Sequence, residues 1–511
     1  MNPDTHPHAL PTTTRVAVIG AGTMGAGIAQ VAAQAGHPVL LYDNRPDAAG
    51  QALADIAQQL QKRVEKGRQS SEDRAAILGR LQTSTTLSDL AGSGLVIEAI
   101  VEDLSIKQQV FGELEQLCSE DALFATNTSS LSVTALASGL KDPGRMAGMH
   151  FFNPAPAMKL CEIVSGLASR PEVVATMTDT ALAWGKVAVQ VASTPGFIVN
   201  RVARPFYTEA MKVYEEGGAD IVTLDTVLKQ AGRFPMGPFA LTDLIGQDIN
   251  LAVSQSVFAS FFQDRRFEPS MVQKALVDAG YLGRKSGRGF YCYDGSDAPI
   301  AAPVTPTEVL PDSPIEVSGD PGTWAALLGR FENAGINITH TTKTAPGELW
   351  LNGVCLSLTD GRTATTLAES SGHSERVVFD LAHDYRSTDT LAVAAADQAS
   401  KSALPLIAAL FHRIGIQLYA LDDVPGLIVQ RTVCMLTNLA ADAVHKGVCT
   451  VQDVDAAMVS GTGYPSGPLV WGQQLGYGNV RTVLLHLEQA YGDGRYRPSP
   501  WLQRSAVAKH A

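Results

Sequence analysis

The sequence predicts an α/β domain built on a mostly parallel sheet, followed by an all-helical domain that occurs twice. In residues 15–193, short runs of β-branched residues alternate with stretches of helical periodicity. This alternation is typical of parallel sheets that helices cover on both faces. From residue 194 the helical pattern continues to about residue 289, and a stretch of similar character follows near residue 425.

The first domain opens with a strand, a glycine-rich turn, a helix and a second strand. Residues 15–19 (RVAVI) and 37–43 (HPVLLYD) are the two apolar runs that we expect to be strands. Small and apolar residues at helical spacing lie between them. Further strands are expected in four segments, GLVIEAIV (94–101), ALFATNTSS (122–130), GRMAGMHFF (144–152) and KVAVQV (186–191).

Two helices are expected between the second strand and the third. The first is a long helix that begins at Pro46, since proline suits a helix N-terminus, and ends near Arg68. The second begins near Ser71, whose hydroxyl can cap it, and ends near Leu81. This helical excursion carries a basic cluster formed by Lys62, Arg63, Lys66 and Arg68.

The composition excludes several functional classes. The chain has 511 residues, of which 45% are hydrophobic and 18% charged, which is typical of a globular protein with several cores. Its formal net charge of −12 argues against non-specific nucleic-acid binding, which needs a basic surface. No apolar run approaches the roughly 20 residues of a membrane span. Residues 1–15 also lack the apolar core of a signal peptide.

The cysteines point to a reducing compartment. None of the six forms a CxxC pair, and none lies near a histidine at zinc-finger spacing. We therefore expect reduced thiols, no metal site, a cytoplasmic location, and no nucleic-acid or membrane partner.

The helical domain is repeated at a constant offset in the numbering. The matched pairs share this offset and include Pro195 and Pro425, Gly196 and Gly426, Arg201 and Arg431, Pro235 and Pro465, and Gly246 and Gly476. An ungapped match of this extent indicates duplication. Between the two copies, residues 315–400 have the strand–glycine–helix rhythm of a shortened nucleotide-binding unit, without its three-glycine spacing.

A G-x-G-x-x-G motif directly follows the first strand and opens the first helix. Gly20 permits the tight turn, Gly22 lets a pyrophosphate approach the backbone, and Gly25 lets helix and strand pack closely. The pyrophosphate would meet the free N–H groups of the helix N-terminus, where Thr23 and Met24 lie. This context is typical of dinucleotide binding in a Rossmann-type domain, although a glycine-rich turn without a ligand is the simpler alternative.

Asp43 ends the second strand and follows Gly20 at about the spacing that an acidic residue has in dinucleotide-binding motifs. A carboxylate at this position accepts hydrogen bonds from the adenosine ribose hydroxyls and would repel a 2′-phosphate, so it favours NAD over NADP. Arg45, the second residue after Asp43, weakens this inference because an arginine can accommodate a 2′-phosphate.

These features divide the chain into five segments. We expect a Rossmann-type NAD-binding domain at 1–193, a helical substrate and dimerisation domain at 194–293, a linker at 294–314, a degenerate Rossmann-like segment at 315–422, and the second helical domain at 423–511.

Several motifs in order resemble the L-3-hydroxyacyl-CoA dehydrogenase family, also called the 3-hydroxybutyryl-CoA dehydrogenases. They are VIEAIVEDLSIK (96–107), NTSSL (127–131), HFFNPAPAMKLCEIV (150–164), TPGFIVNR (194–201), GPFALTDLIG (237–246) and GRKSGRGFY (283–291). The resemblance covers about residues 15–291. The two-repeat length resembles the phenylacetate-pathway branch of this family, whose substrate is 3-hydroxyadipyl-CoA.

The resemblance implies NAD-dependent oxidation of the 3-hydroxyl of an (S)-3-hydroxyacyl-CoA to a 3-oxoacyl-CoA. It also implies that His150 is the catalytic base and that Glu162 orients it, because the family has this pair at this spacing. An imidazole suits proton transfer near neutral pH. A carboxylate on its other ring nitrogen fixes the tautomer and stabilises the imidazolium. Taken alone, a histidine in an apolar strand would be a core residue.

The resemblance assigns further site residues. Ser129 and Asn200 match residues that hold the reacting oxygen and the cofactor, though each could instead cap a helix. Asn153 matches a residue beside the nicotinamide. Cofactor contacts on the ribose side and elsewhere are implied for Glu102, Lys107 and Lys285, and Lys107 could equally be a solvated lysine.

The basic cluster at residues 62–68 has two interpretations. It could be a solvated helix face, or it could hold the phosphates of coenzyme A, because family members bind CoA with this helical excursion. The acyl-CoA substrate is the expected partner.

The second half is expected to be catalytically silent. Gln430 stands where the first copy has Asn200, and no second HFFNP or G-x-G-x-x-G occurs. Small family members dimerise through the helical domain, so its duplication could supply that packing within one chain, and a homodimer is the alternative. Two other functions remain open, namely an NAD-dependent dehydrogenase of a non-CoA hydroxyacid and a non-catalytic NAD-binding protein.

Overall fold

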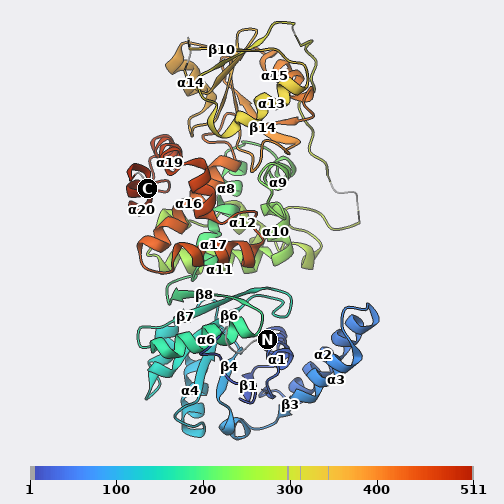
Figure 1. Cartoon of the computed structure of the whole chain (residues 1–511), viewed down its shortest axis with the longest axis vertical. Helices are drawn as coiled ribbons and strands as arrows, with labels where there is room; N and C mark the ends of the chain where they lie inside the picture. Colours follow the sequence, from blue (N-terminus) through green and yellow to red (C-terminus); the bar gives the residue numbers. More distant parts are fainter. Residues whose placement is uncertain (1–5, 296–298, 311, 343–344, 509–511) are drawn as a thin grey trace. The chain divides into compact units, whose positions relative to one another are not determined.

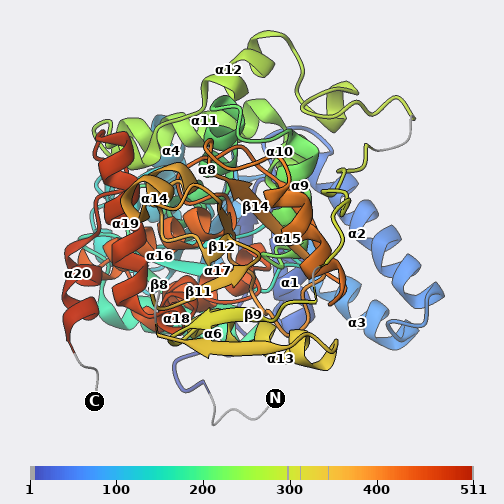
Figure 2. The same cartoon turned by 90° about the horizontal axis from the view of Figure 1, so that it is seen from above.

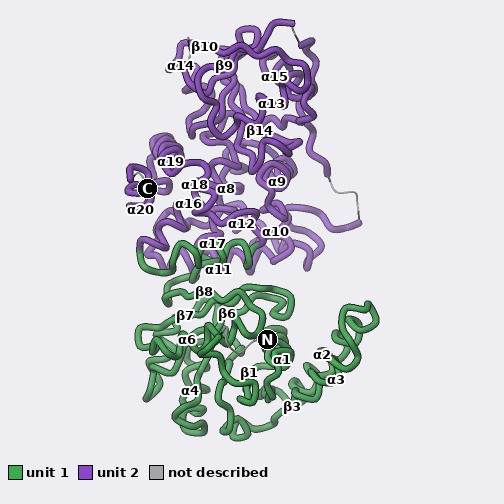
Figure 3. The backbone as a smooth tube through the Cα atoms, in the orientation of Figure 1, with its two compact units in different colours: residues 1–201, 446–462 green, residues 202–445, 463–511 purple. Residues whose placement is uncertain are grey.

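The computed structural model describes residues 6–295, 299–310, 312–342 and 345–508. The chain forms two compact units (Figure 3). Unit 1 comprises residues 1–201 and 446–462, and unit 2 comprises residues 202–445 and 463–511.

Unit 1 is built on an eight-stranded sheet with the order β3-β2-β1-β4-β5-β6-β7-β8 (Figure 1). Neighbouring strands are parallel except for β6 and β7, which pair in the antiparallel direction. The strands are β1 (Val16–Ile19), β2 (Val39–Tyr42), β3 (Leu81–Ser84), β4 (Leu95–Glu98), β5 (Leu123–Thr126), β6 (Met146–Phe151), β7 (Leu160–Ser165) and β8 (Val187–Ala192). The predicted mostly parallel sheet is confirmed.

Helices cover both faces of this sheet. They are α1 (Thr23–Ala35), α2 (Ala48–Glu65), α3 (Ser71–Arg80), α4 (Leu104–Leu117), α5 (Val133–Ala137), α6 (Pro171–Ala183) and α17 (Val451–Thr462). Successive residues of β1 point to opposite faces. Val16 and Val18 join a core with α1 and α6, while Ala17 and Ile19 join a core with α4 and α5.

The helical excursion differs from its prediction at its ends. Helix α2 begins at Ala48 and ends at Glu65 rather than near Arg68. The cap of α3 is Ser70 and not Ser71, because the Ser70 hydroxyl accepts a hydrogen bond from the Asp73 N–H at 3.0 Å. Two adjacent serines offer the same cap, and only the backbone path decides between them.

Unit 2 contains most of both helical copies. The first supplies α8 (Arg204–Glu215), α9 (Ile221–Gln230), α10 (Pro238–Ile245), α11 (Gln247–Ser260) and α12 (Met271–Asp278), and the second supplies α16 (Val429–His445), α18 (Pro468–Leu475), α19 (Tyr477–Tyr491) and α20 (Pro500–Val507). Helices α10 and α18 begin at equivalent residues of the repeat, Pro238 and Pro468, and α11 and α19 do so as well. Equivalent helices of the two copies therefore begin at residues separated by the offset of the sequence repeat.

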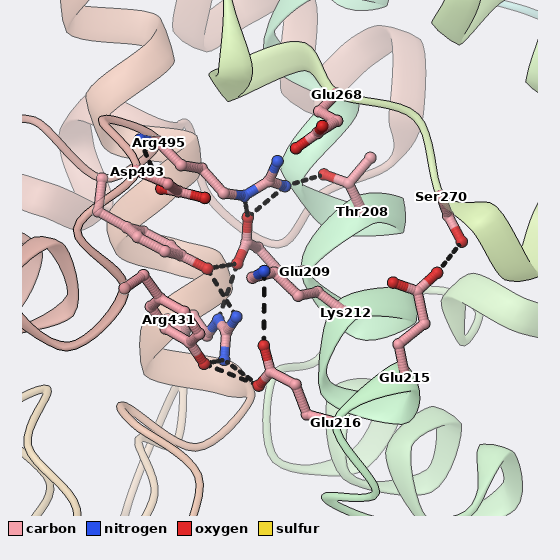
Figure 4. Close-up of polar contacts among 12 residues, drawn as sticks. Thr208, Glu209, Lys212, Glu215, Glu216, Glu268, Ser270, Arg431, Asp493 and Arg495 are labelled. Atoms are coloured by element: carbon pink, nitrogen blue, oxygen red, sulfur yellow. Dashed lines mark hydrogen bonds and ion pairs between the residues drawn. The ribbon is translucent and has the colours of Figure 1, made fainter.

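A buried ion-pair network joins the two helical copies within unit 2 (Figure 4). The Glu209 carboxylate on α8 accepts hydrogen bonds from Arg431 of α16 at 2.8 Å and from Arg495 at 2.7 Å. All three side chains are at most 3% exposed. Arg495 also donates to the carbonyl of Arg265, its own equivalent in the first copy. Such a contact between equivalent positions is expected close to the axis of a pseudo-twofold pair.

The second sheet, also in unit 2, has seven strands in the order β10-β9-β11-β12-β13-β14-β15. They are β9 (Ile315–Ser318), β10 (Ile338–Thr341), β11 (Glu348–Leu351), β12 (Val354–Leu358), β13 (Arg376–Phe379), β14 (Thr390–Ala395) and β15 (Gln417–Ala420). Helices α13 (Ala325–Asn333), α14 (Ala364–Ser371) and α15 (Ala403–His412) pack on it (Figure 2). The turn after β9 begins with Gly319 but has Trp324 at the place where the first sheet has Gly25.

Across the described residues, no helix is long and apolar enough to cross a membrane, and no group of histidine, cysteine and acidic side chains could hold a metal ion. All six cysteines are free thiols.

Candidate active site

The glycine motif forms the turn between β1 and α1. Gly20 has a positive φ of 99°, a conformation that favours glycine. A Cβ on Gly25 would lie 1.7 Å from the Gly20 carbonyl oxygen, so only glycine fits there. A Cβ on Gly22 would meet nothing within 4 Å, and no side chain caps the helix there. This open helix N-terminus, with Thr23 and Met24 as its first residues, fits a pyrophosphate.

Asp43 lies beside this turn, directly after β2. Its Oδ2 accepts a hydrogen bond from the Ala21 N–H at 2.7 Å, and its Oδ1 accepts one from Arg45 Nε at 2.9 Å. Hydrogen bonding to Arg45 outweighs the cost of burial and lowers the pKa of Asp43 to about 2. The carboxylate is therefore ionised at neutral pH and holds Arg45, whose side chain is 66% exposed.

His150 and Glu162 face each other across the antiparallel pair of β6 and β7. The His150 Nδ1 lies 2.7 Å from Glu162 Oε2, and both residues are buried. The other oxygen of Glu162 accepts hydrogen bonds from the N–H groups of Ile198 and Val199 at 3.0 Å each. Glu162 is thus held on both sides, and the geometry leaves Nε2 of His150 for a substrate.

A cavity of about 370 Å³ lies in front of His150. It brings together residues that the sequence singled out in five separate motifs, namely Met24, Glu102, Lys107, Ser129, His150, Asn153 and Asn200. Its other lining residues are Ala99, Ile100, Asn127, Phe151 and Phe152. Lys285 belongs to unit 2, where its ammonium pairs with Asp248 at 2.6 Å.

The two helix-cap alternatives do not hold. The cap of α5 is Ser132, whose hydroxyl accepts from the Ala135 N–H, and Ser129 lies earlier in the chain. Asn200 is the second residue of α7 (Val199–Val202) rather than the residue before it. Both residues line the cavity.

Glu102 organises the turn that carries Ser129. Its Oε1 accepts hydrogen bonds from the Thr128 hydroxyl at 2.5 Å and from the N–H groups of Ser129 and Ser130 at 3.1 and 3.2 Å. Burial opposes the charge on Glu102, but the ion pair with Lys107 and these hydrogen bonds outweigh it and lower its pKa to about 2. The interpretation of Lys107 as a solvated lysine is wrong, because its side chain is 1% exposed.

Sequence reasoning missed several residues of the site. Glu98, at the end of β4, is fully buried and pairs with Lys107 at 3.0 Å. The Asn127 side-chain oxygen accepts a hydrogen bond from the Phe151 N–H at 2.8 Å and so fixes the residue next to His150. The Phe152 ring lies 4.5 Å from the His150 ring. The sequence did offer a clue to Glu98, because an acidic residue ends an otherwise apolar strand (LVIE).

The basic cluster lies at the C-terminal end of α2, where Lys62 and Arg63 form the last turn and Lys66 follows as the cap residue. All four side chains, including Arg68, are exposed. Cations at a helix C-terminus also stabilise the helix dipole.

The second half lacks the dyad. At the offset of the repeat, Asp380 stands for His150 and Ala392 for Glu162. The Asp380 carboxylate accepts hydrogen bonds from the N–H groups of Ile428 and Val429 at 2.9 and 2.7 Å, the positions equivalent to those that Glu162 binds. A cavity of about 470 Å³ lies in unit 2 at the matching end of the second sheet, with Gln430 in its wall.

Comparison with known proteins gives family matches over most of the chain. The model "3-hydroxyacyl-CoA dehydrogenase, NAD binding domain" matches residues 15–194. The model "3-hydroxyacyl-CoA dehydrogenase, C-terminal domain" matches twice, at residues 196–293 and 426–511, which confirms the repeat. The model "3-hydroxybutyryl-CoA dehydrogenase reduced Rossmann-fold domain" matches residues 356–425.

Similar proteins carry related names. The chain is 42% identical over 496 residues to the 3-hydroxyadipyl-CoA dehydrogenase of Escherichia coli, covering 96% of this chain and 97% of that protein. It is 42% identical to the 3-hydroxybutyryl-CoA dehydrogenase of Clostridioides difficile over 55% of this chain and 99% of that protein. A crystal structure of 3-hydroxybutyryl-CoA dehydrogenase from Escherichia coli matches with a TM-score of 0.87 at 42% identity, covering 98% of this chain and 99% of that one.

Proposed function

The chain belongs to the 3-hydroxyacyl-CoA dehydrogenase family, and we propose that His150 and Glu162 are the proton-transfer pair of its reaction. The protein is an NAD-dependent oxidoreductase that converts a 3-hydroxyacyl-CoA to a 3-oxoacyl-CoA. Bound NAD⁺ supplies the hydride acceptor, and the protein must remove the hydroxyl proton. The single observation that carries the proposal is the 2.7 Å contact between His150 Nδ1 and Glu162 Oε2 at the back of the cavity.

In this proposal His150 takes the hydroxyl proton at Nε2. Glu162 accepts the Nδ1–H, which keeps Nε2 free of a proton before the reaction and stabilises the imidazolium afterwards. Because Ile198 and Val199 hold the second oxygen of Glu162, the carboxylate cannot turn away from the imidazole. This rigidity keeps the base oriented without reorganisation during the reaction.

Ser129 and Asn200 would hold the reacting oxygen. Both line the cavity with His150, and both are hydrogen-bond donors that suit an oxygen gaining negative charge. Asn153 lines the same cavity and would lie beside the nicotinamide.

The remaining residues would hold the cofactor. The glycine turn (Gly20, Gly22, Thr23, Met24 and Gly25) would bind the pyrophosphate, and Asp43 the adenosine ribose. Glu102, Lys107 and Lys285 are proposed as further contacts. The exposed basic cluster on α2 would bind CoA phosphates, since arginine and lysine are the usual partners of phosphate.

We propose 3-hydroxyadipyl-CoA as the physiological substrate and the cytoplasm as the location. The similarity to the Escherichia coli 3-hydroxyadipyl-CoA dehydrogenase extends over the second half as well as the first. In the proposed layout, residues 1–193 bind NAD and carry the dyad, and residues 194–293 and 423–511 form an internal helical pair in place of a homodimer. Nucleic acid and membrane are not proposed as partners.

A substrate panel tests this function. Initial rates of NAD⁺ reduction would be compared for 3-hydroxyadipyl-CoA, 3-hydroxybutyryl-CoA, 3-hydroxyhexanoyl-CoA and free 3-hydroxybutyrate. We expect the highest kcat/KM with the adipyl ester and none with the free acid. A preference for the butyryl ester would refute the proposed substrate, and turnover of the free acid alone would favour a non-CoA hydroxyacid dehydrogenase.

A further inference from the structure

Three charged side chains lie together at one wall of the cavity that contains His150. Glu98 ends β4 at the centre of the sheet, Glu102 follows in the next turn, and Lys107 lies in the opening turns of α4. Lys107 Nζ contacts Glu98 Oε1 at 3.0 Å and Glu102 Oε2 at 2.7 Å. We call these residues the Glu98 cluster. Two carboxylates share one ammonium, so the cluster carries a net charge of about −1.

The structure holds Glu98 firmly in place. Its Oε1 also accepts a hydrogen bond from the Ile100 N–H at 2.7 Å, and its Oε2 accepts one from the Thr126 hydroxyl at 2.7 Å. The side chain is completely buried. A buried carboxylate is costly unless it is paired and hydrogen-bonded. Here the ammonium of Lys107, the Ile100 N–H and the Thr126 hydroxyl supply this pairing and hydrogen bonding.

The Glu98 cluster lies close to the reacting atoms. Glu102 and Lys107 line the same 370 Å³ cavity as His150. If His150 removes the hydroxyl proton, as proposed above, the hydride leaves the carbon that bears this hydroxyl. The nicotinamide ring would then have to lie within a few ångströms of that carbon. Bound NAD would therefore place its ring in this cavity, within reach of the electric field of the cluster.

The nicotinamide ring is the part of the cofactor whose charge changes. It is cationic in NAD⁺ and neutral in NADH, while the phosphates are the same in both forms. A fixed negative charge in a cavity shielded from water therefore attracts the oxidised ring and leaves the reduced ring nearly unaffected.

We propose that Glu98, acting through Lys107 and Glu102, is a positioning residue that keeps one uncompensated negative charge beside the nicotinamide and so favours binding of NAD⁺ over NADH. Without Glu98, Lys107 and Glu102 would form a pair with no net charge, and the carboxylate of Glu98 adds one negative charge to this pair. The net charge at the cavity wall is then negative rather than zero. The cluster also fixes the turn with Ser129, because Glu102 binds the Ser129 N–H.

The test is the ratio of the dissociation constants of NAD⁺ and NADH in the full-length protein. NADH binding is followed by its fluorescence and NAD⁺ binding by competition. For Glu98→Gln, which keeps the size and can keep the contacts to Ile100 and Thr126, we expect the ratio Kd(NAD⁺)/Kd(NADH) to rise about tenfold. A merely structural role would weaken both cofactors alike and leave the ratio unchanged, and that result would overturn the proposal.

Two further variants keep the test decisive. Glu115→Gln is the matched control, because Glu115 is a largely buried glutamate near the other end of α4, paired with Arg145 at 3.3 Å and about 12 Å along the helix from Lys107. It should leave the ratio unchanged, and a similar rise would contradict the proposal. If Glu98→Gln does not fold, Glu102→Gln removes the same unit of charge from a partly exposed position and must raise the ratio.

This test is independent of turnover. If His150 is not the base, replacing it leaves the rate intact, whereas the inference about Glu98 is judged by the ratio of the two dissociation constants alone.

Discussion

Asp43, proposed above to bind the adenosine ribose, also holds the side chain of Arg45. Its carboxylate binds the Arg45 side chain through Nε at 2.9 Å and through the terminal nitrogen at 3.0 Å. As long as this pair is formed, Arg45 is not available for a 2′-phosphate, and the carboxylate repels one. If Asp43 binds the ribose as proposed, the preference for NAD over NADP depends on the charge of this one carboxylate.

Replacing that charge should change the cofactor preference. In Asp43→Asn, Arg45 is released and can bind a 2′-phosphate, so we expect NADPH to bind about tenfold more tightly relative to NADH than in the wild type. Fluorescence titration with both cofactors measures this change. The double variant Asp43→Asn/Arg45→Ala should lose the gain. An unchanged NADPH affinity in the single variant would contradict the role given to Arg45.

At the scale of elements, each helical copy begins against a buried carboxylate of its own sheet. Glu162 binds the N–H groups of Ile198 and Val199 at the first copy. Asp380 binds those of Ile428, Val429 and Gln430 at the second. Asp380, at the position equivalent to His150, thus accepts hydrogen bonds from the backbone N–H groups that correspond to those bound by Glu162 in the first half. No histidine takes part in this arrangement.

Asp380→Ala should therefore weaken unit 2 without affecting catalysis. Three backbone donors at the start of α16 lose their acceptor in a buried position, which costs about 2–4 kcal/mol. We expect a lower urea midpoint, while kcat stays within about twofold of the wild type because a variant that remains folded keeps His150 and Glu162 in unit 1. Asp380→Asn, which keeps one acceptor oxygen, should lose less. A large fall in kcat at unchanged stability would refute a purely structural role.

The sequence patterns predicted the elements well where local periodicity decides them. Short apolar runs predicted most strands of the first sheet but not β3 or β7, and the constant offset between matched residues predicted the second helical copy. The ends were less certain, as at Ser70 and Ser71, because neighbouring residues compete for the same cap. The antiparallel pairing in the second sheet was not foreseen, since strand direction depends on contacts distant in sequence.

The site was predictable only in part, for a similar reason. The spacing of His150 and Glu162 does not reveal that β6 and β7 pair in register, which places the two side chains together. The burial of Lys107 was missed, because a lysine in the first turns of a helix is normally solvated. Its partner Glu98 lies on the preceding strand, and only the turn between β4 and α4 brings the two charges together.

At the scale of the whole molecule, the second half completes a buried surface of the first. Arg431 and Arg495, both from the second helical copy, form ion pairs with the fully buried Glu209 (Figure 4). A chain ending at residue 295 would lack both arginines and the packing of α16 against α8.

We expect such a truncated chain to dimerise or aggregate, because it exposes the apolar and charged face of α8. Sedimentation or light scattering at several protein concentrations measures this. A stable monomer of residues 1–295 would rule out the internal-pair interpretation.

The same network predicts sensitivity to acid. The cost of burying Glu209 is outweighed by Arg495 and Arg431, and its pKa is lowered to about 2 from an ordinary value of 4.5. A group with a depressed folded-state pKa stabilises the fold above its unfolded pKa, and this stabilisation is lost as the pH falls toward the folded pKa. The melting temperature of the wild type should therefore fall between about pH 4.5 and pH 2.

Glu209→Gln is the comparison for this prediction. It should melt lower than the wild type at pH 7, because two buried arginines lose their partner. Its melting temperature should also depend less on pH below 4.5. Parallel curves for the two proteins would show that Glu209 does not contribute to the acid sensitivity.

The proposed function depends on His150 as the base, and the rate of a variant without this imidazole tests that role. NADH oxidation by acetoacetyl-CoA is compared in the wild type, in His150→Gln and in His37→Gln, a control at another buried histidine of unit 1. We predict that kcat falls by about 10²–10⁴-fold in His150→Gln with an unchanged NADH dissociation constant, and that the control stays near the wild type. A His150→Gln protein that binds NADH and keeps kcat within a few-fold of the wild type would contradict the account.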